Sequence, residues 1–178
     1  MTIREILLLG DERLYEASAP VEPDGITDLL PVIADLHDTM ADFQARHGWG
    51  RAIAAPQIGV PLRIVCMHVD EPLTFLNPVI DLQSSESMEF WEDCMSFPEL
   101  LVRIRNPRRC RLTYRDVDWH EHHIHLEDDF AELLQHEVDH LDGVLAVQRA
   151  IDDKSIVLRR ARPPKQLELV GLFEPVDG

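Results

Sequence analysis

The sequence has 178 residues, of which 45% are apolar, and its formal net charge is −16. This length is enough for one sizeable core and short for two, so we expect a single domain over residues 1–178, ending in a helix and tail from about residue 151. The strong negative charge argues against general nucleic-acid binding. The longest apolar runs are interrupted by Pro61 or Arg63, and none is long enough to cross a membrane.

The cysteines and the N-terminal residues indicate in which cellular compartment the protein is expected. The three cysteines are widely spaced and do not suggest a disulfide framework. Cys66 and Cys110 lie in strand-like apolar patterns, so we expect both in the core. The first nine residues include Glu5 and have too short an apolar stretch for a signal peptide. We therefore expect a cytoplasmic protein in which Cys94 stays a thiol.

The hydrophobic periodicity predicts an α+β domain. Helical spacing covers residues 24–46, with Pro31 near the first turn and Gly48 closing the helix. A second helix is expected over residues 127–141, ended by Asp142 and Gly143, and a last one over residues 151–161. Strand-like patterns cover residues 62–69, 74–80, 88–91, 101–105, 109–116 and 124–126. The expected architecture is a set of short antiparallel strands packed around a central helix.

The segment 48–60 is rich in small residues and contains an uncharged amide, Gln57. Small residues let a peptide backbone approach closely. The amide of Gln57 can donate a hydrogen bond to a developing oxyanion without adding charge. Taken alone, however, the segment favours a buried connector with a turn at Pro56.

Cys94 lies in the segment 91–98, which we expect to be a strand followed by a turn. A catalytic metal site commonly has three protein ligands and keeps one position for water. A cysteine thiolate combined with two imidazoles suits a borderline-soft divalent ion such as Fe(II), Zn(II), Ni(II) or Co(II). The alternative is a buried free cysteine that packs as a small apolar residue.

The most informative stretch is His136-Glu137-Val138-Asp139-His140, which reads HExxH within the predicted second helix. Residues four apart lie on one helix face, so His136 and His140 can aim two imidazoles at one ion. Glu137 is then well placed to act as the base that activates a water molecule. The alternative is a surface helix that carries two histidines by chance, and a third ligand is needed to decide.

Three segments, taken in this order, resemble the peptide deformylase family. That family has a glycine-rich loop ending in AAPQxG, then EGCLS, then QHExDH. The corresponding segments here are Ala54–Gly59, Glu92–Ser96 and Gln135–His140. The resemblance extends from about residue 6 to about residue 150. It implies the family's fold, in which antiparallel strands surround the metal-binding helix.

The resemblance also implies a ligand set and an activity. Cys94, His136 and His140 would hold one divalent ion, with Fe(II) as the native metal and Zn(II), Ni(II) or Co(II) as alternatives. The family removes the formyl group from the N-terminal formyl-methionine of nascent chains and releases formate. Its peptide substrates pair their main chain with strands beside the cleft.

Three further roles follow from the resemblance. Glu137 would take the proton from the attacking water and later deliver it to the leaving amine. The side-chain amide of Gln57 and the backbone N–H of Met95 would stabilise the oxyanion.

The first two motifs depart from the family pattern. Ala52 replaces a glycine, and we expect its methyl group to obstruct close approach of the substrate, with added strain if φ is positive there. Arg51 stands where the family usually has isoleucine. Asp93 replaces the glycine before the ligand cysteine and places a carboxylate beside the metal segment. Our hypothesis is that hydrolysis survives while substrate preference has drifted.

Several polar residues allow two interpretations. Asp139 either bonds a ligand histidine or holds the helix in place, and we favour the second. We expect Glu92 to pair with Arg103 or Arg105, either fixing the Cys94 segment or forming an ordinary surface pair. For the histidines near Glu121, a polar turn between strands is a better interpretation than a second metal site; they are His120, His122, His123 and His125.

A basic stretch interrupts the acidic sequence near the C-terminus. Because some family members dock at the ribosome through this part, it is a candidate RNA contact. The alternative, which we favour, is a solvated helix end before Pro163 and Pro164. The basic residues are Lys154, Arg159, Arg160, Arg162 and Lys165.

Three functions are therefore compatible with the sequence. The first and favoured one is an active peptide deformylase. The second is a related hydrolase acting on another N-formyl or small N-acyl compound. The third is a non-catalytic relative that binds metal for stability or binds peptide termini, against which the presence of Glu137 and Gln57 argues.

Overall fold

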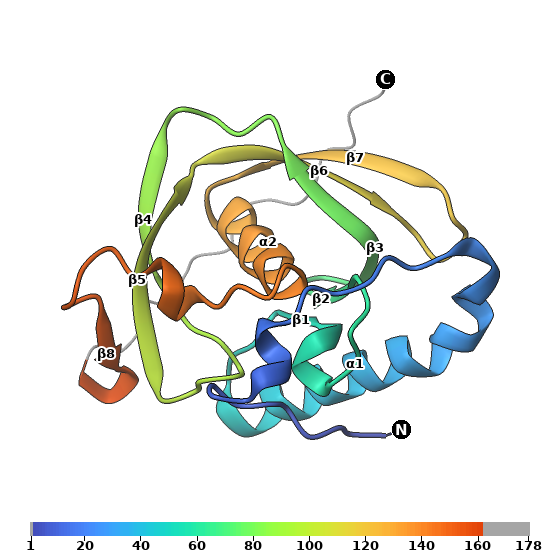
Figure 1. The fold of residues 1–178 in the computed structure, drawn as a ribbon, viewed down its shortest axis with the longest axis horizontal. Coiled ribbons are helices and arrows are strands. Elements are labelled where there is room, and N and C mark those ends of the chain that lie inside the picture. Colours follow the sequence, from blue (N-terminus) through green and yellow to red (C-terminus); the bar gives the residue numbers. More distant parts are fainter. Residues whose placement is uncertain (1, 162–178) are drawn as a thin grey trace.

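The computed structural model describes residues 2–161, which form two antiparallel sheets and two α-helices (Figure 1). The α-helices are α1 (Ile26–His47) and α2 (Asp128–Leu141). The strands are β1 (Ala52–Ala54), β2 (Ile64–His68), β3 (Pro72–Asp81), β4 (Ser87–Glu92), β5 (Leu100–Pro107), β6 (Arg109–Arg115), β7 (Glu121–Glu127) and β8 (Ile156–Leu158). Short 3₁₀ helices cover Glu12–Tyr15, Pro23–Gly25, Ala55–Ile58, Ala146–Arg149 and Arg159–Ala161.

The larger sheet has the strand order β1-β2-β3-β6-β7, and the smaller sheet has the order β4-β5-β8. Most neighbours in the sheets are consecutive strands, for example with Ile53 opposite Cys66 and Cys110 opposite Leu126, while β3 pairs with β6 and β5 with β8. Within the described residues β1 pairs only with β2, so β1 is an edge strand. Figure 1 shows α2 at the centre, enclosed by the two curved sheets, and α1 along the outer side of the larger sheet. This architecture confirms the predicted α+β fold.

Around β2 the larger sheet is buried on both faces, because alternate side chains of this strand serve two apolar clusters. On β2, Val65 and Met67 pack in the cluster that contains α2. Ile64 and Cys66 point to the other face and pack in the cluster that contains α1. Period-two alternation of a strand explains this division. The sheet is thus fixed from both sides, and α2 is held against it.

The helix α1 is amphipathic and ends where glycine permits a left-handed backbone. Its buried face includes Ile33, Leu36 and Met40. Gly48 has φ 77° and donates its N–H to the carbonyl of Gln44, which closes the helix. The predicted helix over residues 24–46 is therefore confirmed to within two residues at its start and one at its end. Pro31 lies in the second turn, slightly deeper than predicted.

The helix α2 is enclosed on nearly all sides, unlike α1. Its apolar side chains pack against the larger sheet, among them Ala131, Leu134, Val138 and Leu141. The polar residues His136, Glu137 and His140 are buried as well. Since buried polar groups need partners, their enclosure is a sign of a built site. Neither α1 nor α2 combines the length and apolar character needed to cross a bilayer.

Two sequence-based expectations about local structure are wrong. The segment expected to be only a connector contains β1, a three-residue strand whose small side chains gave no strand signal. The helix expected over residues 151–161 is instead a turn followed by β8 and a short 3₁₀ helix. The carboxylate of Asp152 accepts hydrogen bonds from the Lys154 N–H and the Ser155 hydroxyl, which stabilises the turn.

Candidate metal centre

Cys94, His136 and His140 converge although 42 residues separate the cysteine from the first histidine. Their ligand atoms all lie within 4.8 Å of one another, and all three residues are buried. Cys94 Sγ is 3.2 Å from Nε2 of His140. The two imidazole rings have centroids 4.8 Å apart and are nearly perpendicular, at 82°. One thiol and two imidazoles are thus directed at a common point.

The local structure explains this convergence. The two histidines lie one turn apart on α2, so their side chains leave the same face. Cys94 follows β4 in a tight turn, in which its carbonyl accepts the N–H of Phe97 at 3.0 Å. The turn is tied to the N-terminal segment, where the N–H of Leu9 bonds the carbonyl of Ser96 at 2.7 Å. Backbone hydrogen bonds therefore fix the turn that carries the thiol.

Glu92 fixes the orientation of one ligand. Its Oε2 lies 2.9 Å from Nδ1 of His136, and both side chains are buried. The sequence-based pairing of Glu92 with an arginine is wrong, because Arg103 pairs with Asp152 and Arg105 pairs with Glu89. When His136 donates its Nδ1 proton to Glu92, its Nε2 lone pair is free for a metal ion.

The charges at the centre favour a cation. Burial opposes the charged form of His136, yet Glu92 and Cys94 raise its pKa well above the ordinary value. Burial, together with the neighbouring His136, lowers the pKa of His140 well below the ordinary value. His140 is thus a neutral imidazole with its Nε2 facing the sulfur. A buried soft sulfur and two nitrogens fit a borderline-soft divalent ion.

Glu137 lies beside these ligands and is itself buried. Among the described residues its Oε2 has no hydrogen-bond partner. Burial raises the pKa of Glu137 to about 7. A carboxyl group with an unpartnered oxygen and a pKa near neutrality is suited to accept and release a proton.

Gln57 approaches the centre from the 3₁₀ helix that follows β1. Its Oε1 accepts the N–H of Ala54 at 2.8 Å, which fixes the amide plane. Its Nε2 then points at the Cys94 turn, 3.2 Å from Ser96 Oγ and 3.5 Å from Cys94 Sγ. Met95, which lies between Cys94 and Ser96 in the sequence, is buried as well. All six residues predicted from the sequence for the site are thus gathered in one place.

Comparison with known proteins identifies the family. The family model described as "Polypeptide deformylase" matches residues 3–155. This chain belongs to the polypeptide deformylase family. A peptide deformylase of Hyphomonas neptunium is 37% identical over 153 residues, which cover 83% of this chain and 84% of that protein. One of Bradyrhizobium diazoefficiens is 33% identical over 178 residues, with 94% and 96% covered.

Solved structures give the same result. The crystal structure of peptide deformylase from Thermotoga maritima has a TM-score of 0.78 and 30% identity, covering 85% of this chain and all of that chain. That of a peptide deformylase from Legionella pneumophila has a TM-score of 0.74 and 37% identity, with 83% and 86% covered. The family resemblance inferred from the three motifs is confirmed.

Ala52, which stands where the deformylase pattern has glycine, is buried in a regular strand. Its methyl group packs in the apolar cluster between the larger sheet and α2. Ala52 lies in β1, and its φ is not positive, so the backbone carries no left-handed strain there. The positive φ lies instead at Gly50, with φ 111°. The expected strain at Ala52 is therefore absent, while obstruction of a substrate by its methyl group stays a prediction.

The other two departures from the deformylase pattern each form an ion pair. Arg51 makes a two-point ion pair with Asp129 in the first turn of α2. Asp93 accepts a hydrogen bond from Nη1 of Arg159 at 3.0 Å. Arg159 also donates to the carbonyl of Pro98 and lies over the Trp49 ring, 3.8 Å from its centroid. Both substituted residues thus tie separate segments together at the edge of the centre.

The basic C-terminal stretch is divided in the structure. Arg159 is largely enclosed through its contacts with Asp93, Pro98 and Trp49, so it does not belong to a solvated helix end. Lys154 and Arg160 are exposed. Arg162 and Lys165 lie outside the described residues.

The remaining polar residues have structural partners. Asp139 forms a two-point ion pair with Arg149, which agrees with the predicted structural role. His122 and His123 lie in β7, bonded to Asp116 and Thr113 respectively. The predicted polar turn therefore includes only His120, while His122, His123 and His125 lie in strand β7. Asp116, Asp118 and His120 form a mostly exposed group, in which Oδ1 of Asp116 already accepts the N–H groups of Asp118 and His120.

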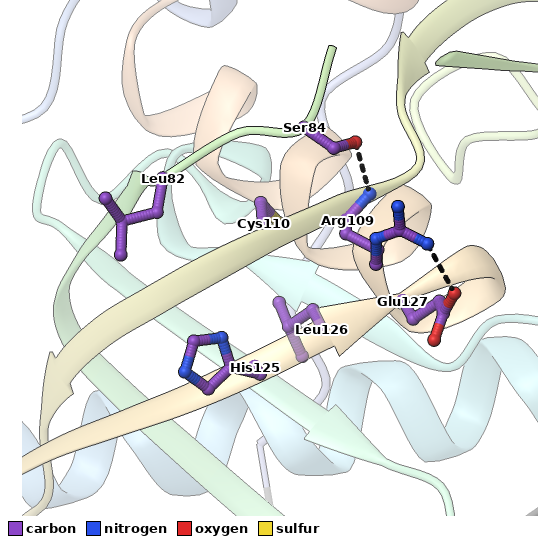
Figure 2. Close-up of a pocket in the computed structure, with 7 residues that line it drawn as sticks. All are labelled: Leu82, Ser84, Arg109, Cys110, His125, Leu126 and Glu127. Carbon is purple, nitrogen blue, oxygen red and sulfur yellow. Dashed lines mark hydrogen bonds and ion pairs between the residues drawn. The ribbon is translucent and has the colours of Figure 1, made fainter. Parts of the chain in front are cut away.

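A surface hollow of about 340 Å³ lies elsewhere, along β6 and β7 beside the end of β3 (Figure 2). Its lining includes Leu82, His125 and Leu126. Arg109 spans it, with its N–H bonded to Ser84 and its guanidinium to Glu127. None of the predicted site residues lines it.

Proposed function

We propose that this chain removes the formyl group from the N-terminal formyl-methionine of nascent peptides and releases formate. The observation that supports the proposal most directly is the buried convergence of Cys94, His136 and His140 beside Glu137. Family membership supports the same reaction. A related solved structure, described as the Met-Ala-Ser-bound peptide deformylase of Acinetobacter baumannii, has a TM-score of 0.75.

The metal would be held by Cys94, His136 and His140. A divalent ion bound there would lower the pKa of a water molecule toward neutrality and so supply a nucleophile at physiological pH. We propose Fe(II) as the native ion, with Zn(II), Ni(II) and Co(II) also accepted, because a mixed sulfur and nitrogen ligand set suits all four. A reducing cytoplasm would keep both the thiol and Fe(II) in the required state.

Glu137 is the proton carrier in this proposal. Its unpartnered Oε2 and its pKa near 7 allow it to accept a proton from the attacking water. The same carboxyl group then donates that proton to the departing amine. This second transfer completes the cleavage of the formyl C–N bond, leaving a free N-terminus and formate.

Two donors would stabilise the negative oxygen that forms when the carbonyl is attacked. The Nε2 of Gln57 is fixed by the hydrogen bond between its Oε1 and the Ala54 N–H. The backbone N–H of Met95 lies in the turn between Cys94 and Ser96, toward which Gln57 points. Preorganised uncharged donors of this kind are effective because they need no reorganisation during the reaction.

The free edge of β1 would position the peptide. This strand pairs only with β2 among the described residues, and it leads directly to Gln57. An extended peptide can add to such an edge through main-chain hydrogen bonds. Its formyl end would then lie at the metal centre, while the rest of the chain extends outward.

A ribosome contact is a further part of the proposal. Within the predicted basic stretch, Lys154 and Arg160 are the described side chains that are exposed, and on a protein of net charge −16 they are suited to contact ribosomal RNA. The test is co-sedimentation with ribosomes of the intact chain and of a Lys154→Glu, Arg160→Glu variant. Equal pelleting of both proteins would exclude a role for these two residues.

The catalytic proposal is tested by formate release from formyl-Met-Ala-Ser, using Fe(II)-loaded protein kept anaerobic. Glu137→Gln should still bind metal but lose activity by at least about 100-fold. The control is Glu71→Gln, which removes the same charge from an exposed turn between β2 and β3. Full activity of Glu137→Gln would show that the base is assigned wrongly, and no formate from the unaltered protein would overturn the function.

A further inference from the structure

Charged side chains occupy the face of α2 that leads to the metal centre. Asp129 and Glu132 precede His136 by seven and four residues, so all three lie on one face of the helix. Asp129 forms its two-point ion pair with Arg51, the residue just before β1. Since β1 and α2 are packed together in one apolar cluster, these charges lie at the rim of the cluster, next to the site.

Arg51 and Asp129 neutralise each other. Their side chains are only 23% and 25% exposed, so the pair is partly withdrawn from water. A guanidinium held at two points by a carboxylate has little capacity left for another anion. The pair therefore helps to fix the shape of this face but adds little net charge to it.

Glu132 is different because it has no such partner. It is half-buried, and no described residue forms a hydrogen bond or ion pair with it. Its electrostatic neighbours are Glu92, His136, Arg51 and Asp129, which places it between the metal centre and the Arg51–Asp129 pair. A half-buried carboxyl group without a partner is costly, so a ligand that satisfies it would gain binding energy.

The substrate's first side chain is placed near this group by the proposed function, on which this inference rests. A peptide added to the free edge of β1 runs past Arg51 before its formyl end reaches the centre. The side chain nearest the formyl group then faces either solvent or α2, where Glu132 lies one turn before His136.

We propose that Arg51, Asp129 and Glu132 form a charged pocket for the first side chain of the substrate, and that it favours formyl peptides whose first side chain ends in a cation. Burial and the neighbouring Glu92 hold the pKa of Glu132 well above its ordinary value, so in the free protein its carboxyl group is neutral. The ammonium of a bound lysine would pair with this carboxyl group and favour its ionised form. A methionine thioether would bury that carboxyl group without a partner. The substrate range thus extends from formyl-methionine to cationic formyl peptides.

The test compares kcat/KM for formyl-Lys-Ala-Ser and formyl-Met-Ala-Ser on the metal-loaded protein. We expect the lysine peptide to equal or exceed the methionine peptide. Glu132→Leu should lower the lysine-to-methionine ratio by at least about tenfold, the effect of one charge-assisted hydrogen bond. Glu132→Gln keeps the shape and should lower the ratio less, while Glu71→Gln, which removes an equal charge elsewhere, should leave it unchanged.

A second measurement does not depend on turnover. The product tripeptides Lys-Ala-Ser and Met-Ala-Ser are titrated calorimetrically into the same four proteins, and the ratio of their dissociation constants should follow the same order. A preference for methionine above about tenfold in the unaltered protein, or equal ratios in all four proteins, would overturn the pocket. If no formyl peptide is cleaved, the proposed reaction fails while the product titration still decides the pocket.

Discussion

The carboxylate of Glu92, the last residue of β4, accepts a hydrogen bond from Nδ1 of His136 at 2.9 Å. Both side chains are buried, with Glu92 2% exposed. The bond links the smaller sheet to α2 and selects the imidazole tautomer whose Nε2 faces Cys94. A ligand histidine oriented in this way has less freedom to lose when an ion binds.

Replacing Glu92 should therefore weaken metal binding without unfolding the protein. We expect Glu92→Gln to lower the affinity for Zn(II) by about 10- to 100-fold, because the amide is a weaker acceptor and carries no charge. The measurement is competition against a chromophoric chelator. Glu89→Gln in the same strand, which removes an exposed partner of Arg105, is the control. Equal affinities for the two variants would show that Glu92 does not tune the ligand.

The Asp93–Arg159 pair should couple the ligand turn to the C-terminal strand. Because Arg159 also bonds the Pro98 carbonyl and lies over Trp49, its guanidinium is already ordered. A double-mutant cycle with Asp93→Asn and Arg159→Gln, measured by urea unfolding, should give a coupling free energy of about 1 kcal/mol. The exposed pair Arg105–Glu89 should give less. Equal couplings would mean that the enclosure of Arg159 adds nothing.

Gly143, which follows α2, should tolerate no side chain. It has φ 73°, and an added Cβ would lie 2.5 Å from the carbonyl oxygen of Tyr15. Gly143→Ala should therefore lower the free energy of unfolding by at least about 2 kcal/mol.

Two other glycines serve as controls that distinguish the cost of a positive φ from the cost of a steric clash. Gly10 has φ 105° but open space around it, so Gly10→Ala should cost about 1 kcal/mol. Gly25 has open space and an ordinary φ, and Gly25→Ala should change stability by less than about 0.5 kcal/mol. Urea unfolding of the three variants checks this order, and a loss at Gly143 no larger than at Gly10 would contradict it.

Cys66 should make stability depend on pH in the alkaline range. Burial raises the pKa of its thiol from 9.0 to about 12, so folding favours the protonated form. This contribution is complete below about pH 9 and is lost as the pH rises toward about 12, because the unfolded thiol ionises first. Between about pH 9 and 10.5, the free energy of unfolding should fall more steeply for the unaltered protein than for Cys66→Ala.

The control for this effect is Val65→Ala, which removes a buried neighbour in β2 that does not titrate. Its stability should be lower throughout but should fall with pH as steeply as that of the unaltered protein. Parallel curves for Cys66→Ala and Val65→Ala would show that the thiol of Cys66 does not contribute.

What could be predicted from the sequence depended on how local the signal was. That His136 and His140 lie on one helix face follows from helical spacing alone, and the structure confirms that their rings lie side by side. The approach of Cys94 could not be read from spacing, because it requires the turn after β4 to dock against α2. Only the family resemblance supplied it.

The errors have the same origin. Glu92 was expected to pair with a nearby arginine, but it faces inward from β4 and meets a histidine 44 residues away. Glu132 was not singled out from the sequence, although its position four residues before His136 places it on the ligand face of α2. The last helix was predicted from residues whose strand partner, β5, lies far back in the sequence. Long-range contacts, which local propensity does not encode, decided both the partner of Glu92 and the formation of β8.

The ligand atoms come from the end of one sheet and from the helix that the other sheet encloses. An unfolded or half-assembled chain cannot present sulfur and both nitrogens together, so tight capture of the ion must await docking of the two layers. An ion held by Cys94, His136 and His140 would link the turn after β4 to α2, and its binding would stabilise the docked arrangement of the two. Metal binding would therefore raise the free energy of unfolding, and unfolding would release the metal.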